Sequence, residues 1–108
     1  MRFERTESFK SDYQRLSEKE REMFRTAARV FNVACDHFIT TRDSSSWPVG
    51  LRVKAVVNAP GVFEMTWSFS GPDGRATWQW TTVITDRGDS VPAMLWQRLG
   101  GHKIFREP

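Results

Sequence analysis

Residues 62–69 of the chain read VFEMTWSF, and this short stretch decides the fold class. Apolar and polar residues alternate strictly along it, and successive side chains of a β-strand point to opposite faces. Phe63, Met65, Trp67 and Phe69 therefore share one face, while the polar residues between them share the other. The pattern predicts a strand that is buried on one face only, which is typical of an antiparallel sheet covering a core.

A second strand with the same alternation follows directly. The sequence GPDG at 71–74 predicts a tight turn, and residues 75–81 read RATWQWT. The aromatic residues of this strand fall on the buried face, whereas Arg75 and Thr77 fall on the opposite face. The sheet face that carries Arg75 is therefore predicted to be polar and exposed to solvent, as one face of an antiparallel sheet commonly is. A further turn, DRGD at 86–89, precedes a last predicted strand from about Val91 to Leu99.

Upstream of the sheet the chain changes to a helical period, after a short predicted strand at residues 2–5. Phe9, Tyr13 and Leu16 recur at three- and four-residue spacing, as in a helix with one buried face. Ser17 and Glu20 form a capping box, which predicts the start of a second helix. The apolar stripe of that helix consists of Phe24, Ala28, Phe31, Cys35 and Phe38.

Residues 40–50, TTRDSSSWPVG, have the composition of a linker between the helices and the sheet. Trp47 lies in this linker and is the one tryptophan expected to be exposed. The whole order is β-α-α-β-β-β. It predicts an α+β fold in which an N-terminal helical hairpin packs on a small, mostly antiparallel sheet.

Composition sets outer limits on organisation and function. A chain of 108 residues with 39% hydrophobic and 27% charged residues predicts a single globular domain over residues 1–108. No apolar run is long enough to cross a bilayer. The first ten residues lack the apolar core of a signal peptide. A single cysteine cannot form an internal disulfide. A cytoplasmic protein is the expectation. The net charge of +3 comes from twelve arginines against four lysines, and arginine forks suit phosphate.

Several familiar chemistries find no support in the sequence. With two histidines and one cysteine a zinc site cannot be assembled, and no metal or other cofactor is expected. The triplet Cys35-Asp36-His37 is not a convergent site, because adjacent helix positions diverge by about 100° and Cys35 belongs to the apolar stripe. Phosphate-loop and nucleophile-elbow motifs are also absent from the sequence.

Basic residues gather at the end of the chain, where residues 95–105 read LWQRLGGHKIF. His102 is the natural proton carrier, because an unperturbed imidazole titrates near neutrality. Arg75, Arg98 and Lys54 are candidates for stabilising negative charge on a phosphate. Arg98 also continues the strand pattern of its neighbours, so a solvated strand-end arginine is the plain alternative.

Glu64 is predicted to share the face of Arg75. It is either a base or, as we favour, the cross-strand partner of that arginine.

Taken in order, these segments resemble the RelE/ParE toxin superfamily. The opening RFERTESFKSDYQRLSEKER resembles its strand followed by sFxxdyxxL, residues 61–67 (GVFEMTW) resemble its "giyElr" strand, and residues 96–102 (WQRLGGH) resemble a "WRRIGTH" ending. Arg75 stands where many members have a sheet arginine. The family pattern is broken at Thr66, where an arginine is common, and at Gly74, where an aromatic residue is common.

The resemblance implies the toxin of a toxin–antitoxin pair, with a cognate antitoxin as partner and neither a membrane nor a small-molecule cofactor. RelE-like members cleave mRNA on the ribosome without a metal, so ribosome and mRNA are the further implied partners. In that case Arg75, Arg98 and His102 are the expected catalytic residues, and Arg52, Lys54 and Lys103 are expected to bind RNA. Two alternatives stay open: a ParE-like inhibitor of DNA gyrase that acts by contact, or a degenerate relative that only binds nucleic acid or a partner.

Overall fold

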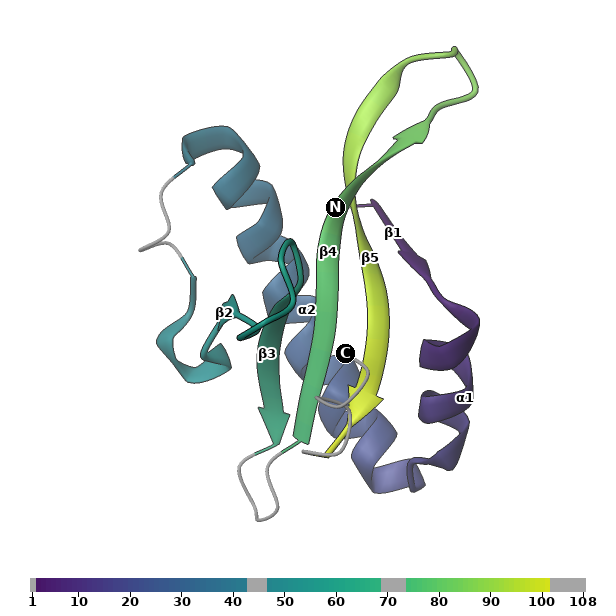
Figure 1. Ribbon diagram of the computed structural model, residues 1–108, viewed down its shortest axis with the longest axis vertical. Helices are drawn as coiled ribbons and strands as arrows, with labels where there is room; N and C mark the ends of the chain where they lie inside the picture. Colours follow the sequence, from purple (N-terminus) through teal and green to yellow (C-terminus); the bar gives the residue numbers. More distant parts are fainter. Residues whose placement is uncertain (1, 43–46, 69–73, 102–108) are drawn as a thin grey trace.

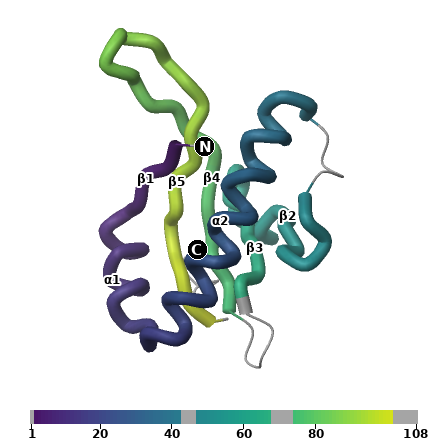
Figure 2. Tube along the Cα trace, turned by 180° about the vertical axis from the view of Figure 1, so that it is seen from behind, coloured from purple at the N-terminus to yellow at the C-terminus, as the bar shows by residue number. Residues whose placement is uncertain are grey.

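The computed structural model describes residues 2–42, 47–68 and 74–101 as two helices packed on a five-stranded sheet (Figures 1 and 2). In chain order the elements are β1 (Arg2–Arg5), α1 (Glu7–Arg15), α2 (Glu18–Thr41), the 3-10 helix η2 (Val49–Leu51), β2 (Lys54–Ala55), β3 (Phe63–Ser68), β4 (Gly74–Ile84) and β5 (Ser90–Gly100). The strands are ordered β1-β5-β4-β3-β2, with β1 parallel to β5 and the other neighbours antiparallel. The predicted α+β fold is confirmed, and β2 is a strand that the sequence pattern did not reveal.

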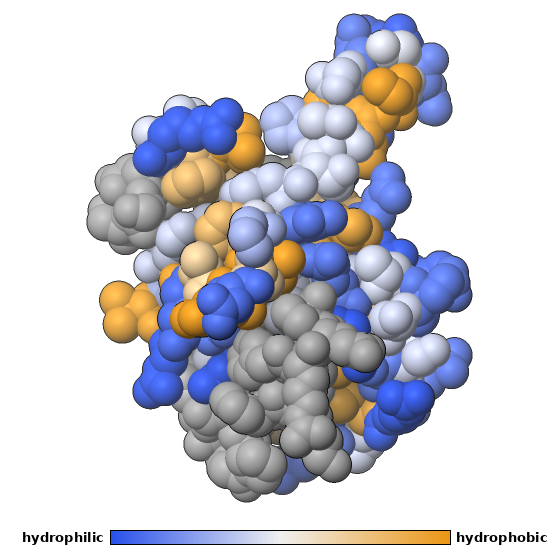
Figure 3. Space-filling model, in the orientation of Figure 1, coloured by the Kyte–Doolittle hydropathy of each residue, from blue (hydrophilic) through white to orange (hydrophobic). Residues whose placement is uncertain are grey.

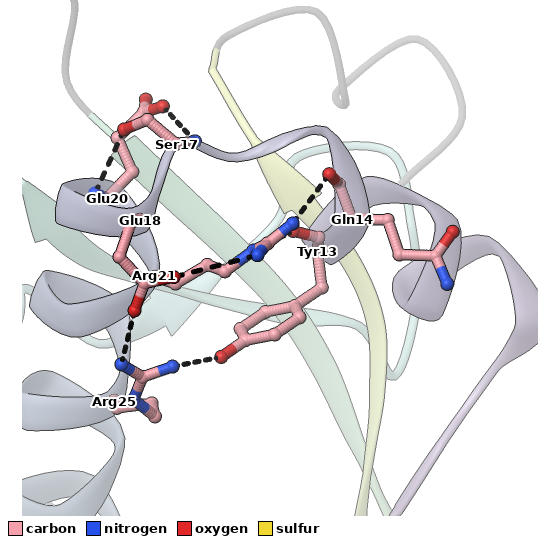
Figure 4. A network of polar contacts seen from close by, with 7 residues as sticks. All are labelled: Tyr13, Gln14, Ser17, Glu18, Glu20, Arg21 and Arg25. Atoms are coloured by element: carbon pink, nitrogen blue, oxygen red, sulfur yellow. Dashed lines mark hydrogen bonds and ion pairs between the residues drawn. The ribbon is translucent and has the colours of Figure 1, made fainter.

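Both helices begin with the caps that their sequences encode. The Thr6 hydroxyl accepts from the backbone N–H of Phe9 at 3.0 Å, and it donates to the carbonyl of Gln97 in β5 at 2.7 Å. The predicted capping box is present: Ser17 and Glu20 exchange their two side-chain-to-backbone hydrogen bonds (Figure 4). One such cap stabilises a helix by about 1 kcal/mol. The cap of α1 thus also ties that helix to β5.

The core lies between α2 and the sheet and is mainly aromatic. Phe31 and Trp78 are fully buried, with ring centroids 4.9 Å apart, and Trp96 lies 5.3 Å from Phe31. Cys35 is also fully buried, as its place in the apolar stripe predicted. The expectation that Trp47 is exposed is wrong, because its ring stacks on Phe31 at 5.5 Å and is partly buried. The linker therefore adds an aromatic side chain to the core.

The hairpin of β4 and β5 extends well beyond the rest of the sheet and twists away from it (Figure 1). Pairing continues to its tip, where Ile84 lies opposite Ser90. Ile84 is 68% exposed, and the turn that follows carries Asp86, Arg87 and Asp89. Figure 3 shows this projection with hydrophilic and hydrophobic residues interspersed on its surface.

Two irregularities in the strand register determine where side chains point. In β5, Trp96 pairs with Trp78 but Arg98 pairs with Thr77, so the strand bulges by one residue at Gln97. A bulge of this kind reverses the alternation of the residues that follow it. In β3 a second shift falls between Thr66 and Ser68.

Among the helices of the described part of the chain, none is long and apolar enough to span a membrane.

Candidate functional site

A row of polar residues crosses four strands on the sheet face turned away from α2. Lys54 in β2 pairs with Glu64 in β3, Glu64 pairs with Thr77 in β4, and Thr77 pairs with Arg98 in β5. Directly opposed residues of neighbouring antiparallel strands lie on the same face. Arg75 lies in the next row, opposite Thr66. The topology thus brings Lys54, Arg75 and Arg98, all predicted from the sequence, onto one sheet face.

Glu64 is the centre of this group. Its side chain is 8% exposed, and its Oε1 lies 3.6 Å from Nζ of Lys54 and 3.7 Å from Nε of Arg75. A carboxylate out of water needs such compensation, because burying an unpaired charge is costly. The expected cross-strand ion pair between Glu64 and Arg75 is therefore present, and Lys54 joins it from the exposed edge.

The expectation that this face is open to water is wrong at its centre. Thr66 is 1% and Thr77 is 0% exposed, and the Arg75 side chain is 17% exposed. Neither threonine hydroxyl has a hydrogen-bond partner within residues 2–42, 47–68 and 74–101. The face therefore holds a buried polar cluster and not a solvated surface.

Arg98 reaches this face because of the bulge at Gln97. Arg98 continues the pattern of Met94 and Trp96 in the sequence, and uninterrupted alternation along the strand would have placed it on the helical side. The guanidinium instead makes two hydrogen bonds to Asp12 of α1, from Nε to Oδ2 at 2.8 Å and from an Nη to Oδ1 at 3.2 Å. Asp12 is 6% exposed and also accepts from the backbone N–H of Leu99 at 3.0 Å.

Asp12 thus closes the edge of β5 beyond the end of β1, where the backbone donor of Leu99 would otherwise be left without a strand partner. Bidentate pairs between arginine and a carboxylate are among the stronger polar contacts in proteins. The solvated strand-end interpretation of Arg98 is therefore wrong: this arginine links the last strand to α1.

The other predicted site residues fall into two groups. Arg52 is exposed and adopts a left-handed backbone conformation, with φ of 47°, at the end of η2, two positions before Lys54. His102 and Lys103 lie outside the described residues, and their predicted roles stay predictions.

Other reactive groups of the described chain do not gather into a second site. No three His, Cys, Asp or Glu side chains within the described ranges come together to hold a metal ion. Cys35 is packed in the core, and burial raises the pKa of its thiol to about 12. A thiol with so high a pKa is inert as a nucleophile near neutral pH.

The contacts of Gly74 show why no larger side chain stands at this position. A Cβ atom built on Gly74 would lie 2.5 Å from Cε2 of the Trp67 ring, so no side chain fits there. Trp67 in turn donates from its indole N–H to the carbonyl of Arg75 at 2.9 Å. The ring of Trp67 thus covers the start of β4.

Sequence reasoning missed three members of the polar cluster. Asp12 is part of the quoted opening motif, but its partner is 86 positions away and no local pattern connects the two. Thr66 and Thr77 were placed on the correct face, but their burial follows from tertiary packing and has no signal in a strand's alternation.

The arrangement of two helices on this five-stranded sheet is a RelE-like α+β fold. The chain is similar in structure to a chain in the crystal structure of the intact E. coli RelBE toxin–antitoxin complex. The match covers 93% of this chain and 94% of that one, with a TM-score of 0.50 and 9% sequence identity. At that identity the likeness shows the fold. No protein-family model matches the sequence, and no curated protein matches it.

Proposed function

We propose that this chain is the toxin of a toxin–antitoxin pair and that it cleaves mRNA on the ribosome without a metal. The observation that carries the proposal is the buried Glu64 carboxylate with its two cationic partners, the largely buried Arg75 and the exposed Lys54, on the sheet of a RelE-like fold. The structural neighbour is a toxin–antitoxin complex, which supports an antitoxin as the partner of this chain. Ribosome and mRNA as further partners, and a cytoplasmic location, are part of the proposal.

The proposed reaction is attack of a ribose 2′-oxygen on the adjacent phosphorus, with departure of the 5′-oxygen. It needs a proton acceptor, cations that stabilise the extra charge on the phosphate oxygens, and a proton donor. Arg75 and Lys54 supply positive charge, and Glu64 holds their side chains side by side. His102 is the proposed proton carrier, while Arg52 and Lys103 are the proposed further contacts to RNA.

Arg98 has two roles in this proposal, one in positioning and one in charge. Its bidentate contact with Asp12 supports a positioning role, in which it holds the end of β5 in place. Its 22% exposed guanidinium lies in the same row as Glu64 and adds positive charge to that face. The sequence also predicts a direct contact of Arg98 with the scissile phosphate, and that contact stays a prediction.

A second candidate function follows from the same contacts. Arg75 is engaged by Glu64 and Arg98 by Asp12, so both arginines have carboxylate partners within the chain. This favours a degenerate relative that binds nucleic acid or a partner and performs no cleavage. Inhibition of DNA gyrase by contact is a third possibility, and the order in which cellular processes stop distinguishes it.

Expression of the full chain in growing cells, with pulse labelling, tests these functions. A ribosome-dependent nuclease should stop incorporation of amino acids before incorporation of thymidine, whereas a gyrase inhibitor should give the reverse order. A folded chain that does not slow growth would favour the degenerate relative. Single-turnover cleavage of ribosome-bound mRNA then tests the chemistry directly.

His102→Gln is the informative variant in that cleavage assay. Glutamine keeps a hydrogen-bond donor but does not titrate near neutrality, so the rate should fall and lose its pH dependence between about pH 5.5 and 8.5. Arg87→Gln at the tip of the hairpin is the matched control. An unchanged rate for His102→Gln would remove the proton carrier from the proposal.

A further inference from the structure

A pocket of about 300 Å³ opens on the helical side of the molecule, between β1, α1 and α2. It is separate from the polar cluster around Glu64, which lies on the other face of the sheet. Its apolar lining includes Phe9, Phe24 and Trp96, whose ring centroids are 5.3–5.7 Å apart. Phe3, 48% exposed, lies at the same pocket. The pocket is large enough for one bulky apolar side chain of a partner.

Three arginines surround this apolar lining: Arg5, Arg25 and Arg29, all exposed. The Tyr13 hydroxyl accepts from Arg25 at 2.6 Å, which fixes that guanidinium beside the pocket (Figure 4). Arg5 and Arg29 form no ion pair with any residue that the structure describes. Arg25 already has Glu18 as an ion-pair partner at 3.4 Å, so the uncompensated positive charge around this apolar pocket, within the described residues, comes from Arg5 and Arg29.

Asn32 supplies a second and independent observation. It lines the same pocket from α2, and its side-chain Oδ1 is buried with no hydrogen-bond partner in the described part of the chain. A buried acceptor without a partner is unfavourable unless a donor reaches it. A peptide N–H or an indole N–H provides such a donor, whereas a phosphate group has none.

We propose that this pocket binds an acidic peptide segment of the antitoxin partner that carries one large apolar side chain. The inference rests on the proposed function, since that function supplies the partner. Acidic side chains of the segment pair with Arg5 and Arg29, and the apolar side chain fills the space above the Phe24 and Trp96 rings. A donor from the segment satisfies Asn32. A peptide is favoured over a nucleic acid because the site combines an apolar pocket with a buried acceptor.

A designed probe tests this with the full-length chain. The probe is the fluorescein-labelled peptide DEEDWEEDE, and its matched control has serine in place of the tryptophan. Fluorescence anisotropy should show binding of the first peptide and binding at least about ten-fold weaker for the second, because the apolar anchor is lost. Arg5→Glu and Arg29→Glu should each weaken binding by about three- to ten-fold. Arg87→Glu, an equal charge reversal at the hairpin tip, should leave it unchanged.

Three results with the peptide probes would overturn the inference: no binding of the tryptophan probe, equal weakening by Arg87→Glu, or equal binding of the serine probe. An RNA decamer of adenosines that binds with the same dependence on Arg5 and Arg29 would overturn it in favour of nucleic acid. The unfolding midpoint of each variant controls for folding, and both substituted arginines are exposed. mRNA cleavage by Arg5→Glu and Arg29→Glu should be unchanged, so a failure of the proposed function and a failure of this inference give different results.

Discussion

Replacement of Arg75 by alanine should destabilise the protein as well as affect its activity. An arginine on an open sheet face would cost no more than about 0.5 kcal/mol on truncation, which is the expectation from sequence alone. The structure changes this estimate. Arg75 is 17% exposed and lies 3.7 Å from the carboxylate of Glu64, which is 8% exposed. The substitution leaves a buried carboxylate with a solvent-exposed lysine, Lys54, as its remaining described ion-pair partner.

The magnitude follows from the charges and their surroundings. Two unit charges 3.7 Å apart interact by about 4.5 kcal/mol at an effective dielectric constant of about 20. Breaking a buried pair costs about 3–5 kcal/mol, but here Lys54 stays at 3.6 Å and both cations retain contact with water. We therefore expect Arg75→Ala to lower the free energy of unfolding by about 2 kcal/mol. In a Glu64→Gln background the same substitution should cost only about 0.5–1 kcal/mol, because no buried charge is left unpaired.

Urea unfolding followed by tryptophan fluorescence measures these values, since Trp78 and Trp96 are buried in the core. With a slope of about 1.5 kcal/mol per molar urea, the midpoint for Arg75→Ala should fall by about 1.3 M. The two single variants and the double variant form a cycle whose coupling energy should be about 1–1.5 kcal/mol. A coupling energy below about 0.5 kcal/mol would refute the argument that Arg75 compensates a buried charge.

Three further outcomes can be checked on the same protein. Gly74→Ala should cost about 1–3 kcal/mol in the free energy of unfolding, because its Cβ would lie 2.5 Å from the Trp67 ring. Asp12→Asn should cost about 2–3 kcal/mol, since Arg98 loses its charged bidentate partner, and thermal unfolding would show it. The thiol of Cys35 should not react with Ellman's reagent at pH 8 until urea unfolds the chain, because it is buried and its pKa is raised to about 12.

These predictions have control variants or outcomes that would contradict them. Gly50→Ala should be nearly neutral by comparison with Gly74→Ala, because a Cβ at Gly50 meets no atom within 4 Å. Equal effects of the two glycine substitutions would contradict the packing argument. A stable Asp12→Asn variant would show that the edge of β5 does not need this carboxylate. The raised pKa of Cys35 also predicts that stability falls above about pH 9 as the unfolded thiol ionises, by about 1.4 kcal/mol per pH unit up to pH 12.

Local patterns in the sequence were sufficient for most of the fold. The capping box of Ser17 predicted the start of α2, and the alternation of residues 63–67 and 75–81 predicted the buried faces of β3 and β4. Patterns of this kind act over a few residues, so they carry no information about pairing across the chain. The two-residue strand β2 and the parallel pairing of β1 with β5 depend on partners 8 or more positions away. Neither has a periodic signal of its own.

The candidate site was predictable in composition but not in geometry. Arg75, Arg98 and Lys54 were candidates from the sequence, and the strand register places them on one face. However, Arg98 reaches this face only because one extra residue, Gln97, interrupts β5. A strict alternation rule places Arg98 beside Trp96 on the opposite face, and a single bulge reverses that assignment. Burial of Glu64 and Thr77 also depends on packing between elements, which no single strand encodes.

The bulge at Gln97 has a consequence for how the two proposed sites relate. Trp96, just before it, lines the pocket between α1 and α2, and Arg98, just after it, lies in the polar row with Thr77. Asp12 of α1 holds Arg98, while Phe9 of the same helix lines the pocket. A partner segment seated in the pocket therefore contacts the elements that position the polar face without touching that face. Binding at the pocket and occupation of the polar cluster are thus sterically compatible, so the acidic probe should bind the chain equally well whether or not RNA is bound.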